Sequence, residues 1–337
     1  MGGNLRKSLV ALVIVVLAVQ SAYALSVMLV EKRQAAGEGY PNESTVTVKL
    51  PDGNVAQLVT CCGVDRDDSA IYTVRDSAGY TVVDHKFTGG RVYLAQNGSL
   101  ISFRKNGDAG LVITFYNHLL SELRSVNLIG VYSAVAGDQG SVAVLQKRAT
   151  GNILRVYNHE GNQRWEHGGV SLGKLYMLPN ELFLLLPAAD GLYQFTVQKG
   201  EQKKLSSNGA VQFIGADPAR KLLFVSLADP AGQQVAAVDQ DTLQIRWTHK
   251  VNDFPAGHCQ KMEVGASRYL HKHGILAVLL RCPGRVRIFY VARFLNLEGE
   301  LLDQHKLGNR VDVGFYELQD KIAIVSDGYL YSFAVRP

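Results

Sequence analysis

A stretch of twelve residues occurs twice in this chain and restricts what the chain can fold into. Residues 156–167 read VYNHEGNQRWEH, and residues 238–249, 82 positions later, read VDQDTLQIRWTH. Each copy opens on a valine and closes on an Arg-Trp pair and a histidine, and together they hold both tryptophans of the chain, Trp165 and Trp247. Because 82 is twice 41, the spacing predicts a repeat of about 41 residues, a period typical of propellers and solenoids.

Weaker copies of the same stretch extend the repeat in both directions. Most neighbouring copies are 41 positions apart, and one step, from Val238 to Phe294, is 56. Seven copies predict seven structural units. Their landmark residues are Val74, Phe115, Val156, Val197, Val238, Phe294 and Val335.

The residues between the landmarks are typical of β-strands. From Thr45 onward, short runs rich in Val, Ile, Leu, Tyr and Phe alternate with Gly, Asn, Asp or Pro, which indicates an all-β protein. A unit of about 40 residues holds four strands, so we predict a seven-bladed β-propeller of four-stranded antiparallel blades over residues 45–337. Asp327-Gly328 predicts a two-residue hairpin. Thr45–Leu50 either completes the last blade, built from 311–335, or opens the first and leaves the last three-stranded.

The N-terminus predicts a membrane segment before the propeller. Ser8 to Val30 carries no charge and is flanked by Arg6-Lys7 and by Glu31-Lys32-Arg33, and such a run is long enough to span a bilayer. We expect residues 1–34 to form a membrane anchor, a single transmembrane helix, with residues 35–44 as a linker. The alternative is a signal peptide cleaved after the small-x-small triplet at 22–24. Either segment would place the bulk of the chain on the extracytoplasmic side.

The charge distribution argues against nucleic acid as a partner. The net charge is +5, but residues 1–34 supply +3 of it. The remaining +2 on the domain is too little for the basic surface that phosphate backbones require. We therefore expect a surface of mixed charge.

The repeat resembles a known family at two hairpins. Gly161-Asn-Gln-Arg-Trp165 matches the Gly-x-x-x-Trp of the quinoprotein-like propeller repeat, and Val238-Asp239…Trp247 resembles the same hairpin, with Leu243 where the glycine should be. In other units Val83 and Asp303 replace the tryptophan. The resemblance implies a propeller of the pyrroloquinoline-quinone type, a superfamily of dehydrogenases and non-enzymatic scaffolds. It also implies that Trp165 and Trp247 pack between blades.

The long step between Val238 and Phe294 predicts an insertion, and insertions in repeat proteins often carry function. Around 251–274 it holds His258, His271, Lys272 and His273, which we regard as candidate partner-binding residues. Cys259 and Cys282 would lie opposite each other in a hairpin centred near 270–271, so we predict a disulfide between them. Free thiols and a metal site remain the alternatives.

Other polar clusters have ordinary structural explanations. Cys61-Cys62 lies on an expected strand and is best explained by two buried thiols, and residues 65–69 (DRDDS) lack the glycine of a calcium loop. Arg281, Arg285 and Arg287 form a basic strip that could remain solvated or meet an acidic partner. Local motifs for nucleophilic, zinc or phosphate chemistry are absent from the sequence, and we predict no catalytic, cofactor-binding or metal-binding residue.

These observations predict a protein-binding scaffold in a membrane or cell-envelope complex. Two alternatives remain: an exported quinone- or metal-dependent enzyme, and a polysaccharide-binding propeller.

Overall fold

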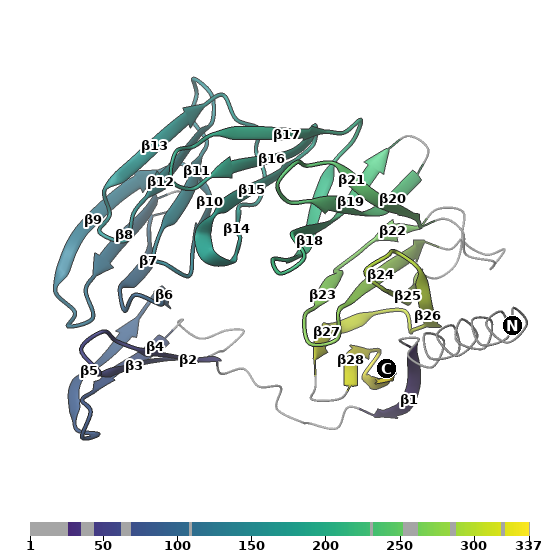
Figure 1. The fold of residues 1–337 in the computed structure, drawn as a ribbon, viewed down its shortest axis with the longest axis horizontal. Helices are drawn as coiled ribbons and strands as arrows, with labels where there is room; N and C mark the ends of the chain where they lie inside the picture. Colours follow the sequence, from purple (N-terminus) through teal and green to yellow (C-terminus); the bar gives the residue numbers. More distant parts are fainter. Residues whose placement is uncertain are drawn as a thin grey trace, which may run out of the picture. The chain divides into compact units, whose positions relative to one another are not determined.

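The computed structural model describes residues 26–34, 44–61, 69–107, 110–229, 232–251, 262–283, 288–317 and 321–336. Their regular secondary structure is β-strand apart from one short 3-10 helix at Pro179–Glu181 (Figure 1). They divide into two compact units. The N-terminal unit comprises Glu38–Gln212 with Ala228–Pro230, and the C-terminal unit comprises Phe213–Leu227 and Ala231–Pro337 together with Met1–Gly37.

The N-terminal unit contains four sheets of four antiparallel strands, each formed by strands that follow one another in the chain. The first sheet is β2 (Ser44–Lys49), β3 (Val55–Cys61), β4 (Ser69–Arg75) and β5 (Thr81–Thr88). The second is β6 (Arg91–Leu94), β7 (Leu100–Asn106), β8 (Gly110–Tyr116) and β9 (Glu122–Ile129). The third is β10 (Val131–Ala136), β11 (Val142–Gln146), β12 (Ile153–Tyr157) and β13 (Gln163–Gly168). The fourth is β14 (Tyr176–Met177), β15 (Phe183–Ala188), β16 (Gly191–Thr196) and β17 (Gln202–Ser206).

The C-terminal unit contains most of a fifth sheet and two further sheets. The fifth is β18 (Val211–Asp217), β19 (Leu222–Asp229), β20 (Gly232–Asp239) and β21 (Ile245–Lys250). The sixth is β22 (Glu263–Val264), β23 (Arg268–Leu270), β24 (Ile275–Pro283), β25 (Ile288–Leu295) and β26 (Leu301–Lys306), in which β22 and β23 both pair with β24. The seventh has the order β1-β29-β28-β27, from β1 (Ser26–Gln34), β27 (Val311–Glu317), β28 (Lys321–Ser326) and β29 (Tyr329–Arg336).

Seven successive antiparallel sheets are the blades of a β-propeller, so the predicted fold class and blade count are confirmed. The predicted hairpin at the C-terminus is confirmed as well. Ser326 opposes Tyr329, and the two residues between them, Asp327 and Gly328, have φ angles of +50° and +74°. Positive φ at both turn positions gives the twist that a tight hairpin needs.

The N-terminal boundaries require a correction. Ser26–Gln34 is not part of a helix: it forms β1, which pairs antiparallel with β29 from Ser26–Arg336 to Gln34–Tyr329. The seventh sheet is therefore four-stranded, and Thr45–Leu50 belongs to the first sheet. Each of the two predicted ways of closing the propeller is thus right in one part only: Thr45–Leu50 opens the first blade, but the last blade still has four strands. Ser44, the last residue of the expected linker, begins β2, and residues 1–25 and 35–43 lie outside the described residues. Within the residues that the structure describes, we find no helix with the length and apolarity to span a membrane.

Apolar cores lie between consecutive sheets within each unit. In the N-terminal unit, Tyr72 and Leu100 belong to the core between the first two sheets, Phe115 to the next and Phe195 to the third, and all four are 0% exposed. A single sheet could not bury both of its faces, so each blade depends on its neighbours for stability.

The repeat corresponds to the turn that joins the third and fourth strands of a blade. In the best copy, the Asn158 side-chain Oδ1 accepts the backbone N–H groups of Glu160 (3.1 Å) and Asn162 (2.8 Å), and Gly161 has a φ of +80°. Asp76, Asn117 and Asn296 cap their turns in the same way. The turn recurs because an Asx side chain and a positive φ specify it locally.

The 238–249 copy differs by one residue from the predicted register. Its turn is longer and is closed by a hydrogen bond from the Asp239 N–H to the Gln244 carbonyl. Leu243 adopts a φ of +59° where the best copy has Gly161, as Leu120 does with a φ of +63° in the Asn117 copy. Val156 lies opposite Trp165 in the first copy, so the repeat predicts Val238 opposite Trp247. Because of the longer turn, Ala237 lies opposite Trp247 instead.

Candidate functional site

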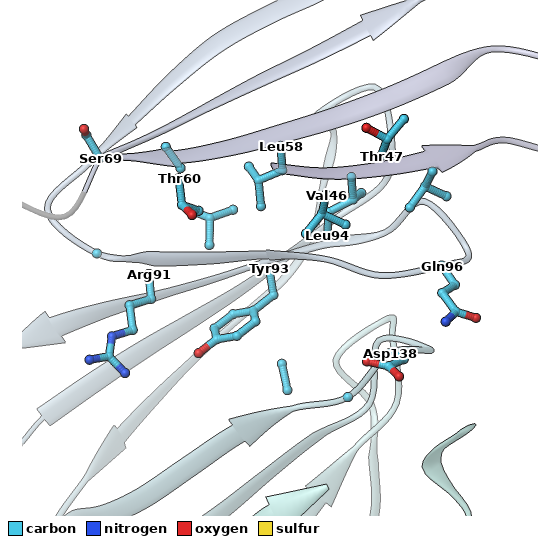
Figure 2. A pocket seen from close by; sticks show the side chains of 16 residues that line it. Val46, Thr47, Leu58, Thr60, Ser69, Arg91, Tyr93, Leu94, Gln96 and Asp138 are labelled. Atoms are coloured by element: carbon cyan, nitrogen blue, oxygen red, sulfur yellow. The ribbon is translucent and has the colours of Figure 1, made fainter. Parts of the chain in front are cut away.

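The candidate site is a groove in the N-terminal unit, formed where the first strands of three consecutive sheets meet. A cavity of about 700 Å³ lies between β2, β6 and the end of β10, a size within the range of roughly 300–1,000 Å³ typical of ligand pockets. Figure 2 shows Val46 and Leu58 on one wall and Arg91 and Tyr93 on the other. Val46 is 42% exposed although it is apolar.

The strand β6 forms the centre of the groove because one of its edges has no neighbouring strand. It is the terminal strand of the second sheet and pairs only with β7. The Ala95 amide donates a 2.9 Å hydrogen bond to the Ser99 carbonyl. In an antiparallel pair every second residue bonds to the same neighbour, so the backbone groups of Tyr93 and Arg91 also face β7. The backbone groups of Val92 and Leu94 therefore point away from β7, and both residues line the cavity.

The third outward amide on this edge shows what such a group can bind. Gln96 lies two residues beyond Leu94, so its N–H also points away from β7. It donates a 2.7 Å hydrogen bond to the backbone carbonyl of Asp138, in the turn between β10 and β11. Among the described residues, the amides of Val92 and Leu94 have no backbone partner of this kind. The edge can therefore accept further backbone carbonyls.

A second cavity, of about 580 Å³, lies on the other side of β6, toward β10. Its lining includes Arg91, Tyr93, Phe103, Lys105 and Tyr132. The rings of Tyr93 and Phe103 meet edge to face with centroids 5.3 Å apart, which fixes the Tyr93 ring at the boundary between the cavities. Tyr132 is 56% exposed. This side is aromatic and cationic, whereas the β2 side is mainly aliphatic.

The two ends of the groove carry opposite charge. Arg91 begins β6, whereas Gln96 and Asp138 lie at the far end (Figure 2). Lys105, like Arg91, lines the second cavity. Arg91, Lys105 and Asp138 are all exposed. A bound molecule would therefore meet positive charge at the start of β6 and negative charge beyond its end.

The structure describes three of the four insertion residues that the sequence singles out as candidate partner-binding residues. His271, Lys272 and His273 form the turn after β23, and their role in binding stays a prediction. His271 contacts the ring of Tyr269, and the Lys272 amide donates to Glu317. His258 itself lies outside the described residues.

The register expected around the cysteines is also wrong. Glu263 opposes Arg281 and Leu270 opposes Ile275, so the position opposite Cys282 is near Met262 rather than at residue 259. Cys282 is fully buried on β24. Cys259 lies outside the described residues, so the disulfide stays a prediction.

The remaining candidates have structural partners or lie outside the described residues. Trp165 and Trp247 each donate a hydrogen bond to a backbone carbonyl of the following sheet, at 2.8 Å and 2.6 Å. Arg281 forms a 3.0 Å ion pair with Glu263. Cys62, residues 65–68, Arg285 and Arg287 lie outside the described residues. Across the described ranges, no three His, Cys, Asp or Glu side chains gather closely enough to hold a metal ion.

Sequence reasoning missed the groove. Residues 91–95 (RVYLA) form one of the short apolar runs typical of a strand, but their composition gives no sign that one edge of that strand stays open. The two consecutive glycines before β6 are the one local signal. A Cβ on Gly90 would lie 2.4 Å from the carbonyl oxygen of Phe103, so the close approach of β6 to β7 requires glycine there.

Comparisons with known proteins support the propeller fold and identify no family. No family model matches the sequence, and no curated protein is similar to it. Among solved structures, a prolyl endopeptidase has a TM-score of 0.51 at 10% identity, covering 87% of this chain and 50% of its own. The Dos1 propeller has a TM-score of 0.49 at 11% identity, covering 91% and 95%. The propeller domain of the Trilobed protease from Pyrococcus furiosus has 0.47 at 8%, covering 89% and 94%.

Proposed function

We propose that this chain is a protein-binding β-propeller, part of a membrane or cell-envelope complex, that works on the extracytoplasmic side of a membrane. The observation that carries the proposal is the groove around β6. It combines an unpaired strand edge, aliphatic and aromatic walls and exposed charge at its ends. Backbone groups, apolar pockets and a charged rim are what a protein segment needs for recognition.

The membrane part of the proposal rests on the sequence before β1. Because β1 begins at Ser26, the uncharged run available to cross a bilayer is Ser8 to Leu25, eighteen residues. That length falls within the range of about 17–25 residues for a transmembrane helix. We propose that this shortened run tethers the propeller, with Ser26 onward on the far side.

We propose a place for the chain in the quinoprotein-like superfamily, on its non-enzymatic branch, and the two Trp hairpins support the superfamily part of this proposal. Gly161 and Trp165 keep the spacing of that repeat, and the turn that they frame has the Asx cap and positive φ described above. The proposal concerns ancestry and architecture and assigns no cofactor to the chain.

Site-specific crosslinking in the native membrane would test the function. Tyr132 in the groove and Tyr80 in the turn between β4 and β5 are 56% and 74% exposed, so each tolerates a photo-crosslinking phenylalanine analogue. We expect one protein to be captured from Tyr132, to be absent from the Tyr80 control, and to co-purify with the unmodified full-length chain in stoichiometric amount.

Two results would contradict the proposal. One is a purified protein that is monomeric and yields the same crosslinks from both positions. The other is a stoichiometric quinone or metal in the purified protein, which would favour the exported enzyme.

A further inference from the structure

We infer that the groove binds an extended peptide segment by strand addition to β6, and that the segment alternates apolar and acidic residues. This inference rests on the proposed protein-binding function and names its site and the chemistry of the partner. The partner segment would become a fifth strand of the second sheet.

The backbone of β6 supplies the first part of the recognition. Val92 and Leu94 present their amides and carbonyls to the groove, and Gln96 on the same edge already bonds the Asp138 carbonyl. A strand placed beside β6 would continue this row of hydrogen bonds. Such main-chain bonds provide affinity in strand addition, whereas the pockets for alternate side chains provide specificity.

The two walls of the groove then select the side chains. Successive residues of an added strand point to opposite faces of the sheet. On the first-sheet side they enter the cavity lined by Val46, Val48 and Leu58, which accepts β-branched or aliphatic groups. On the third-sheet side they meet Lys105 and Tyr132, which favour carboxylates. The expected pattern is therefore apolar-acidic-apolar.

The competing occupants fit less well. Nucleic acid would require a broader positive surface, but Asp138 lies at one end of the groove. A small apolar ligand would use the aliphatic wall and leave the outward amides of Val92 and Leu94 without acceptors. Only an extended peptide uses the strand edge, both walls and the charged end together.

The first test uses a synthetic probe with alternating valine and glutamate, seven residues long, capped at both ends and labelled for fluorescence anisotropy. We expect saturable binding to the full-length protein. N-methylation of all the valines should weaken binding more than tenfold under antiparallel addition, whereas N-methylation of all the glutamates should change it less than threefold. The opposite pair of results would support parallel addition. Equal effects of valine and glutamate N-methylation on binding, or no binding of the unmethylated probe, would overturn the inference.

Two protein variants complete the test. Lys105→Glu should weaken the valine-glutamate probe more than tenfold and strengthen a valine-lysine probe. Val92→Pro removes one outward N–H from an edge strand, where proline is tolerated, and should weaken both probes. Thermal unfolding checks that each variant is folded, and Lys105→Glu, at an exposed position, decides the matter if Val92→Pro is not. Unchanged affinity in folded Lys105→Glu would overturn the inference.

This outcome is separable from that of the proposed function. If a crosslinked partner still binds normally to Lys105→Glu, the chain remains a protein-binding propeller and only the strand-addition site is wrong.

Discussion

The indole N–H of Trp165 donates a 2.8 Å hydrogen bond to the carbonyl oxygen of Val197, which lies in the following sheet. Trp247 makes the equivalent bond to Leu297 at 2.6 Å. In both places the ring also covers a turn glycine of positive φ, Gly200 or Gly299. Each tryptophan thus joins the last strand of one sheet to a turn of the next, which is a physical reason for its recurrence at this position.

Gly200→Ala should destabilise the protein through this contact. The added Cβ would lie 2.8 Å from Trp165 Cδ2 at a φ of +72°. Gly169→Ala is the matched control, because Gly169 has a φ of +73° and no atom within 4 Å of the added Cβ. We expect the control to cost about 1–2 kcal/mol for backbone strain and Gly200→Ala about 1–3 kcal/mol more for overpacking. Urea unfolding measures both, and equal losses would refute the contact's role.

Removal of β1 should destabilise the seventh sheet. A chain starting at Leu25 keeps all eight paired positions of β1 with β29, and a chain starting at Ala35 loses them. At a net value of about 0.5–1.5 kcal/mol for each hydrogen bond, we expect a loss of roughly 5 kcal/mol in the free energy of unfolding. A synthetic peptide of residues 26–34 should restore part of it. If residues 26–34 belonged to a membrane anchor, the two chains would unfold alike.

The blade count could be predicted because the repeated turn is specified locally. Asn158 and Gly161 determine that turn through their own hydrogen bonds and φ angle, so similar residues mark the same turn elsewhere in the chain. Strand ranges followed from apolar runs between such turns. The one-residue error at Val238 arose because the longer turn of that copy, closed by Gln244, cannot be recognised from composition.

The closure of the seventh sheet by β1 and the groove around β6 could not be predicted, because both depend on how distant segments pair. The first five residues of β1, 26–30, continue an uncharged run, so hydropathy alone joins them to a membrane segment, whereas the partner strand β29 lies at the other end of the chain. The groove likewise depends on which edge of β6 is left unpaired after β7 has bonded the other.

The fourth sheet should contribute a pH-dependent term to stability through Asp190. Hydrogen bonds from Lys204 and then Tyr193 lower the pKa of this carboxyl from 3.8 to about 2. A depressed pKa in the folded state adds stability above the unfolded pKa, near 4, and that stability is lost as the pH falls toward 2. Asp190→Asn should therefore unfold with a flatter pH profile between pH 4 and 2 and be less stable than wild type at pH 7. Urea midpoints across this range would reveal it, and parallel profiles would contradict it.

The predicted bond between Cys259 and Cys282 makes a separate stability prediction. A closed loop of about 20 residues should stabilise the fold by about 3 kcal/mol, mainly by restricting the unfolded chain. Cys259→Ala and Cys282→Ala should each lower the free energy of unfolding, and the double variant should cost little more than the costlier single one, because the two residues act as a unit. The cost of Cys259→Ala should vanish under reducing conditions. Peptide mapping of protein from an oxidising compartment would identify the linked pair directly. Rapid alkylation of both thiols in the folded, unreduced protein would show instead that they are free.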